Sequence, residues 1–110
     1  MQIQYDHISH SLAHTLARVD DYLGLFVQGT SMKDAGIRGG SLAVFKRHYE
    51  WVDGAIMLIV KDEGDKKSSQ MHRVRRIHDN WYQCWEDGSG TKEFLDDSYY
   101  PQAILVAVAR

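Results

Sequence analysis

A serine in a glycine-rich turn is the first feature of this sequence that could do chemistry. Ser31 follows a short apolar stretch and lies in the segment Gly29-Thr30-Ser31-Met32-Lys33-Asp34-Ala35-Gly36-Ile37-Arg38-Gly39-Gly40. A serine between a strand and a turn can present its hydroxyl to a substrate while nearby backbone N–H groups face a developing oxyanion. Serine is also common in such turns for conformational reasons alone. The segment therefore indicates a nucleophile at Ser31, with the backbone of Gly29 and Met32 beside the oxyanion, or an ordinary turn.

Histidines near the N-terminus form a second pattern with possible chemistry. His7, His10 and His14 are spaced three and four residues apart, so on a helix they would share one face and could bind a metal. The spacing is short of a metallopeptidase motif, and no carboxylate partner is evident. A solvated helix face is the favoured interpretation, with a pH-sensitive face as the lesser alternative. We therefore expect no metal and no cofactor.

Basic residues gather in one short segment. Within eleven positions the sequence places Lys66, Lys67, Arg73, Arg75 and Arg76. The formal net charge of the whole chain is -2, and acidic and basic residues are mixed along it. A solvated loop and strand face is therefore favoured over a nucleic-acid site. One N-terminal helix is also too little for a helix-turn-helix, so we expect no direct DNA binding.

The spacing of apolar residues changes along the chain. An amphipathic helix over residues 7–22, ending near Gly24, is predicted by apolar positions three or four apart: Ile8, Leu12, Leu16, Val19 and Leu23. Beyond Gly24 the pattern predicts short strands over residues 25–28, 41–46, 55–61, 70–78, 81–86 and 103–109, with a hairpin turn at Asp79-Asn80. We predict a mainly β, compact and strongly curved domain over residues 25–110, preceded by a helical arm over residues 1–24.

Composition narrows the class of protein. A chain of 110 residues with 44% hydrophobic residues fits one compact domain with a modest core, which dimerisation would help to stabilise. A single cysteine, Cys84, excludes an internal disulfide and fits a reducing cytoplasm. The N-terminus has no apolar run after a basic region, and the longest apolar stretch is only residues 55–60. We expect a cytoplasmic protein with neither a signal peptide nor a membrane span.

The region around Ser31 resembles the nucleophile region of the LexA/UmuD-type serine peptidases. The residues that carry the resemblance are Leu25-Phe26-Val27-Gln28-Gly29-Thr30-Ser31-Met32, Gly36-Ile37, Gly40 and Leu42-Ala43-Val44. Asp53-Gly54, Val74-Arg75-Arg76-Ile77 and the closing segment from Ala103 are also similar, so the resemblance covers roughly residues 25–110. It implies a LexA/signal-peptidase-like β-fold and a Ser-Lys dyad, in which a neutral lysine takes the proton of Ser31 and the substrate is usually the protein's own chain.

The sequence departs from this family at the expected base. Aligned with the family's Val-Lys-Arg-Leu pattern, Val74-Arg75-Arg76-Ile77 places Arg75 at the lysine position, and arginine is not deprotonated in proteins. Lys66 and Lys67 are the alternative bases if the register differs, although they are expected at an exposed hairpin tip, where lysine stays charged.

Two further departures concern acidic residues and the substrate. Ser41 and Gly39 stand where the family usually or often has acidic residues. No Ala-Gly or Cys-Gly bond precedes Ser31, and Ala35-Gly36 lies inside the turn, so the chain looks closest in size to processed UmuD.

The resemblance implies three functional hypotheses. The leading one is a non-self-cleaving homodimeric interaction subunit of the SOS response to DNA damage, which binds an error-prone polymerase of translesion synthesis or a recombinase filament in DNA repair. The second is an active serine peptidase with Ser31 as nucleophile and Lys66 or Lys67 as base. The third is a phage repressor-like regulator that forms mixed dimers with a related repressor.

Overall fold

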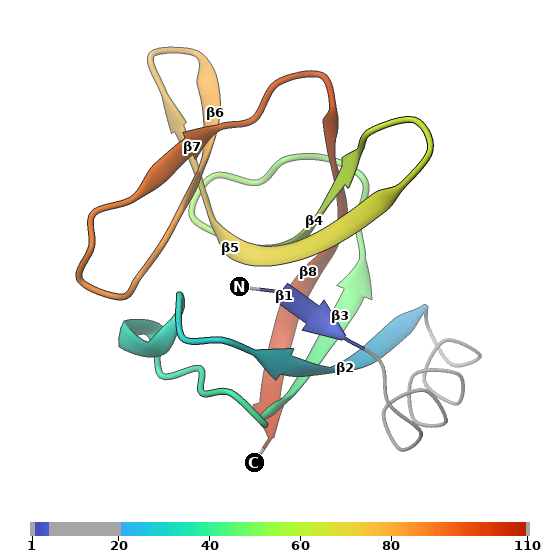
Figure 1. Cartoon of the computed structure of the whole chain (residues 1–110), viewed down its shortest axis with the longest axis vertical. Helices are drawn as coiled ribbons and strands as arrows, with labels where there is room; N and C mark the ends of the chain where they lie inside the picture. Colours follow the sequence, from blue (N-terminus) through green and yellow to red (C-terminus); the bar gives the residue numbers. More distant parts are fainter. Residues whose placement is uncertain (1, 5–20, 110) are drawn as a thin grey trace.

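The computed structural model describes residues 2–4 and 21–109, and this part of the chain is mostly β-structure (Figure 1). The elements are β1 (Gln2–Gln4), β2 (Tyr22–Gln28), the 3-10 helix η1 (Lys33–Ala35), β3 (Leu42–Arg47), β4 (Ile56–Asp62), β5 (Lys67–Ile77), β6 (Asn80–Cys84), β7 (Lys92–Phe94) and β8 (Tyr99–Ala109). The predicted mainly β class is confirmed. Within the described ranges, no helix is long and apolar enough to cross a membrane.

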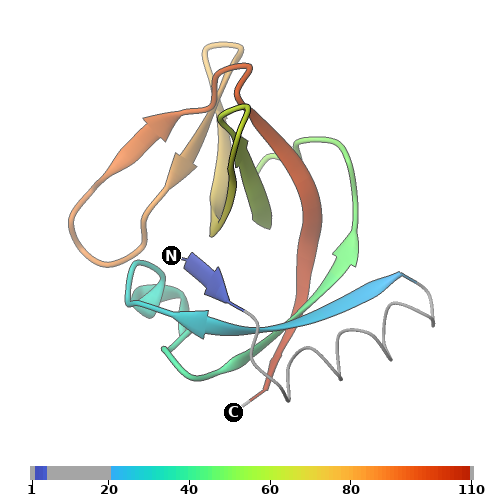
Figure 2. The same cartoon turned by 45° about the vertical axis from the view of Figure 1, so that its right-hand side comes forward.

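The strands form one antiparallel sheet that curls strongly. Its order is β1-β2-β3-β8-β4-β5-β6-β7, and β1 pairs with β5 as well as with β2. The pair Gln2↔Gln70 joins β1 to β5, and Gln2↔Gln28 joins it to β2. Figure 2 shows β1 between the two strands that it links. Curling brings the end of β2, just before Ser31, close to the middle of β5.

The predicted N-terminal helix meets the described residues only at its end. Residues 7–20, with His7, His10 and His14, lie outside the described part of the chain. Asp21 is in a turn, and Tyr22 already begins β2, so the prediction of helix up to residue 22 is wrong at its last two positions. β2 begins as early as Tyr22 because its residue Leu23 packs in the core together with Leu25. The domain division expected after residue 24 falls within this strand.

The observed positions of one hairpin turn and of the start of β8 differ from the predicted ones. The hairpin turn lies at His78 and Asp79, with φ of 50° and 67°, and not at Asp79-Asn80. Positive φ at both central positions suits a two-residue hairpin, because it matches the twist of the flanking strands. β8 begins at Tyr99 and not at Ala103. Pro101 is compatible with this longer strand because it precedes the residues of β8 that pair with β3, so its missing N–H breaks no hydrogen bond to β3.

The core has two clusters of buried apolar side chains. One contains the alternate residues Leu23, Leu25 and Val27 of β2, which face the same side of the strand, together with Phe45 of β3 and Met71 of β5. Met32 and Ile37, from the turn that carries Ser31, are also fully buried in this cluster. The second cluster lies between β4, β5 and β8 and includes Met57, Ile59 and Tyr99. The apolar residues on both sides of Ser31 therefore anchor its turn to the core.

Candidate functional site

Ser31 lies in a tight turn that is held at both ends. β2 ends at Gln28, and Gly29 turns the chain with a φ of 89°, a left-handed conformation that favours glycine. The backbone carbonyl of Ser31 accepts a hydrogen bond from the N–H of Glu86 at 2.7 Å, and the N–H of Asp34 donates to the carbonyl of Glu86 at 2.7 Å. These bonds fix the turn against the segment that follows β6.

The side chain that meets the Ser31 hydroxyl is His72. The Oγ atom of Ser31 lies 3.1 Å from Nε2 of His72, which is fully buried on β5. The ring of His72 stacks on Trp85, with centroids 3.8 Å apart and planes inclined by 25°. Trp85 is the residue opposite His72 if the β5–β6 register, which ends at Arg73↔Cys84, is continued by one step. The sheet itself therefore places the indole against the imidazole.

Gln83 holds the other nitrogen of the imidazole. Nδ1 of His72 lies 2.7 Å from Oε1 of Gln83, and both side chains are fully buried. Gln83 pairs with Val74, two residues beyond His72, so the two polar side chains are diagonal neighbours on one face of the sheet. A carbonyl oxygen only accepts hydrogen bonds, so Nδ1 carries the proton and Nε2 is left as an acceptor for the Ser31 hydroxyl.

Burial keeps His72 neutral. Loss of solvation lowers the pKa of His72 from 6.5 to about 4, while the hydrogen bond to Gln83 acts in the opposite direction. At neutral pH the ring is therefore uncharged, with Nε2 able to take a proton from Ser31. This is the protonation state that a general base needs.

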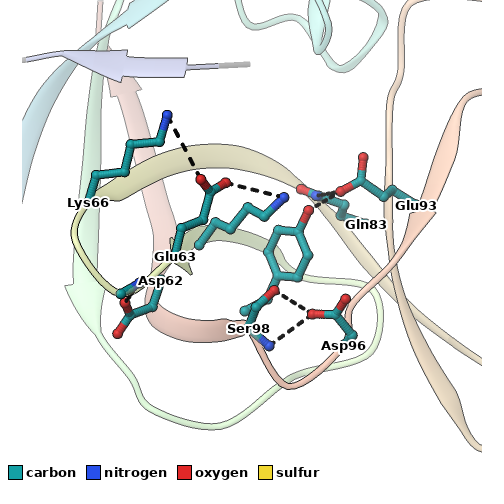
Figure 3. A network of polar contacts seen from close by, with 10 residues as sticks. Asp62, Glu63, Lys66, Gln83, Glu93, Asp96 and Ser98 are labelled. Atoms are coloured by element: carbon teal, nitrogen blue, oxygen red, sulfur yellow. Dashed lines mark hydrogen bonds and ion pairs between the residues drawn. The ribbon is translucent and has the colours of Figure 1, made fainter.

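The network continues outward to β7 and β8. Nε2 of Gln83 donates to Oε1 of Glu93 at 3.3 Å, and the hydroxyl of Tyr99 donates to the same carboxylate oxygen. Figure 3 shows Gln83 and Glu93 pointing toward each other at the edge of this network. The ammonium group of Lys61 lies 5.3 Å from the centroid of the Tyr99 ring. Polar contacts thus run without a break from Ser31 to the surface.

Ser31 and His72 line a cavity of about 500 Å³. Its other lining residues are Gln28, Gly29, Thr30, Gln70, Trp85 and Asp87. Among the described residues, the backbone N–H groups of Ser31 and Met32 donate to no acceptor. Both groups could donate to a negatively charged oxygen beside Ser31, and the expected oxyanion role of the Gly29 and Met32 backbone stays a prediction.

The basic residues considered as the base of Ser31 lie elsewhere. Arg75 is exposed on β5, three residues from His72 and therefore on the opposite face of the strand. Lys66 and Lys67 are exposed at the β4–β5 hairpin tip. Lys66 pairs there with Glu63 at 3.8 Å (Figure 3), and Lys67 pairs with Asp62 at 3.7 Å. None of the three contacts the Ser31 hydroxyl.

Reasoning from the sequence missed His72 and Gln83. The alternation of residues along β5 could have indicated His72. Every second residue of a strand lies on the same face, so His72 shares the face of the apolar Val74. The family's lysine pattern matched the basic run around Arg75 instead.

No known protein-family model matches the chain, and no curated protein matches it. The resemblance around Ser31 is therefore not tested by these comparisons, and membership of the LexA/UmuD-type family stays a prediction. The chemistry of the site rests on its geometry.

Proposed function

We propose that this chain is a LexA/UmuD-type domain with a serine acyl-transfer site, in which Ser31 is the nucleophile and His72 replaces the family's lysine as general base. The observation that carries the proposal is the Ser31–His72–Gln83 arrangement, with distances of 3.1 Å and 2.7 Å. A nucleophile, a base and a third group that orients the base are the parts shared by serine hydrolases on unrelated folds.

The proposed alignment with the family changes accordingly. The Val-Lys-Arg-Leu pattern is placed on Met71-His72-Arg73-Val74, three residues before the register used above. His72 then stands at the lysine position. The contact between His72 and Ser31 supports this alignment, whereas Arg75 faces the other way.

In the proposed reaction, His72 transfers the proton and Ser31 forms the covalent intermediate. Nε2 of His72 takes the proton of Ser31 as Oγ attacks the carbonyl carbon of a peptide bond. The negative oxygen of the tetrahedral intermediate accepts hydrogen bonds from the free N–H groups near Ser31. Collapse breaks the C–N bond, the leaving amine takes the proton from His72, and an acyl ester remains on Ser31. Water activated by His72 then hydrolyses that ester.

Burial also limits the rate of this reaction. The pKa of His72, lowered to about 4, makes the imidazole a weak base, and a neutral amide does not stabilise the imidazolium as a carboxylate would. We therefore expect a slow reaction, suited to one regulatory cleavage per molecule and unsuited to general proteolysis.

Intact-mass spectrometry with a fluorophosphonate probe tests the proposal. We expect one adduct per chain in the wild type and none in Ser31→Ala. Ser68→Ala is the matched control, because Ser68 is an exposed serine of β5. An adduct that persists in Ser31→Ala, or a wild type that never reacts, would refute the assignment of Ser31 as nucleophile.

A second candidate function is the non-cleaving, homodimeric interaction subunit that binds an error-prone polymerase or a recombinase filament. The weak base is one observation in its favour, and the exposed apolar end of β8 is another. Val106 is 50% exposed and Val108 is 38% exposed. Covering such side chains in a dimer would be favourable. Sedimentation of the wild type against Val106→Lys tests this function, which fails if both proteins are monomers.

A further inference from the structure

We propose that Glu93 is a positioning residue for the Ser31–His72 pair, which it controls through the side-chain amide of Gln83. The inference rests on the proposed function and goes beyond it, because Glu93 lies on β7 and touches neither Ser31 nor His72. It acts by deciding which end of the Gln83 amide faces the imidazole.

The orientation of the amide determines which nitrogen of His72 carries the proton. An amide presents an acceptor at one end and donors at the other, within nearly the same shape. With Oε1 toward His72, the proton lies on Nδ1 and Nε2 can accept from Ser31. With the NH₂ group toward His72, Nδ1 becomes the acceptor, the proton moves to Nε2, and the base is lost.

Glu93 favours the productive orientation by chemistry alone. Its carboxylate accepts hydrogen bonds and donates none, so only the NH₂ end of Gln83 can satisfy it. The Nε2–Oε1 distance of 3.3 Å between Gln83 and Glu93 agrees with that arrangement. A flipped amide would place the oxygen of Gln83 against the carboxylate of Glu93, and Nδ1 of His72 could accept from its NH₂ group only after giving up its proton.

The sheet and Tyr99 hold Glu93 in place. Gln83 and Glu93 are direct partners in the antiparallel β6–β7 pairing, so their side chains leave the sheet on one face. Tyr99, which is 8% exposed, donates its hydroxyl to the Glu93 carboxylate from the start of β8. Glu93 is exposed, and without this anchor its side chain would be free to turn into water.

NMR of the imidazole nitrogens is the direct test, because ¹⁵N shifts distinguish a protonated from an unprotonated ring nitrogen whether or not the protein is active. We expect the proton of His72 on Nδ1 in the wild type. In Glu93→Gln, which keeps the shape but can donate as well as accept, we expect both tautomers to appear. Glu50→Gln is the matched control, since Glu50 is an exposed carboxylate between β3 and β4.

Exchanging the two side chains should restore the site. In Gln83→Glu/Glu93→Gln, the carboxylate faces His72 directly and accepts from Nδ1, while the new amide at position 93 donates to it. We expect this double variant to return the proton to Nδ1. We expect the rate of fluorophosphonate labelling to fall about tenfold or more in Glu93→Gln and to recover in the exchange, since a wrong tautomer costs about 10⁴-fold in a serine peptidase triad.

The outcomes separate this inference from the proposed function. If the wild type is not labelled but Glu93→Gln still shifts the tautomer, Ser31 is not a nucleophile and the positioning role stands. If the wild type is labelled and Glu93→Gln changes neither tautomer nor rate, Glu93 is not a positioning residue. Tyr99→Phe gives a second variant should Glu93→Gln not fold, and the inference predicts a smaller shift in the same direction.

Discussion

Acidification should destabilise this protein through His72. The folded state holds the pKa of His72 at about 4, against 6.5 for the free side chain. Between these values the unfolded chain binds a proton that the folded protein excludes, so stability falls as pH falls. The contribution is complete above pH 6.5 and is lost as pH drops toward 4.

The size of the effect follows from the shift. One pKa unit corresponds to about 1.4 kcal/mol, so the whole shift is worth about 3 kcal/mol, of which about 2 kcal/mol is lost between pH 7 and pH 5. His72 is fully buried, so solvent screening reduces this value little. Such a loss is a substantial part of the stability of a small domain.

Urea denaturation at pH 7, 6 and 5 measures this loss. His72→Gln is the control, because glutamine does not titrate and every other acidic or basic group is common to both proteins. We expect the free energy of unfolding of the wild type to fall by about 2 kcal/mol more than that of His72→Gln over this range. Equal losses in the two proteins would refute the burial of a neutral His72.

Three further predictions concern the parts that hold the site. Met32→Ala should lower the free energy of unfolding by about 2–5 kcal/mol, because Met32 is fully buried beside Ser31; a loss below about 1 kcal/mol in a thermal melt would contradict its anchoring role. Trp85→Ala should expose the imidazole and raise the pKa of His72 from about 4 toward 6.5, read by NMR titration, and an unchanged pKa would show that the indole does not shield it. Gly29→Ala should destabilise by about 1 kcal/mol or more, because its φ is 89°, whereas Gly39→Ala lacks that left-handed strain; chemical denaturation compares them, and equal effects would contradict the argument.

Local patterns were enough to predict most strands and the place of Ser31. Leu25 and Val27 alternate with more exposed residues, and the glycines around Ser31 mark a turn, so both features can be found within a few neighbouring residues. β7 was missed because all three of its residues are exposed and give no apolar pattern. β1 was missed because three residues are too few for any period to appear.

The proposed base, His72, could not be found from local patterns. Ser31 and His72 are 41 positions apart, and they meet only because the sheet curls and brings β2 and β5 together. The family pattern directed attention to Arg75, which differs from His72 by an odd number of positions and so faces away. Gln83 reaches His72 through the register of β5 and β6, which no local pattern reports.

The rate of Ser31 labelling as a function of pH tests the central claim most directly. With neutral His72 as base, the rate should be near its maximum by pH 6 and stay level to pH 10, because the pKa of about 4 lies well below this range. It should be lost in His72→Gln and kept in the double variant Lys66→Met/Lys67→Met. A rate that climbs steadily from pH 7 to pH 10 and disappears with the two lysines would contradict the account and return the role of base to the hairpin.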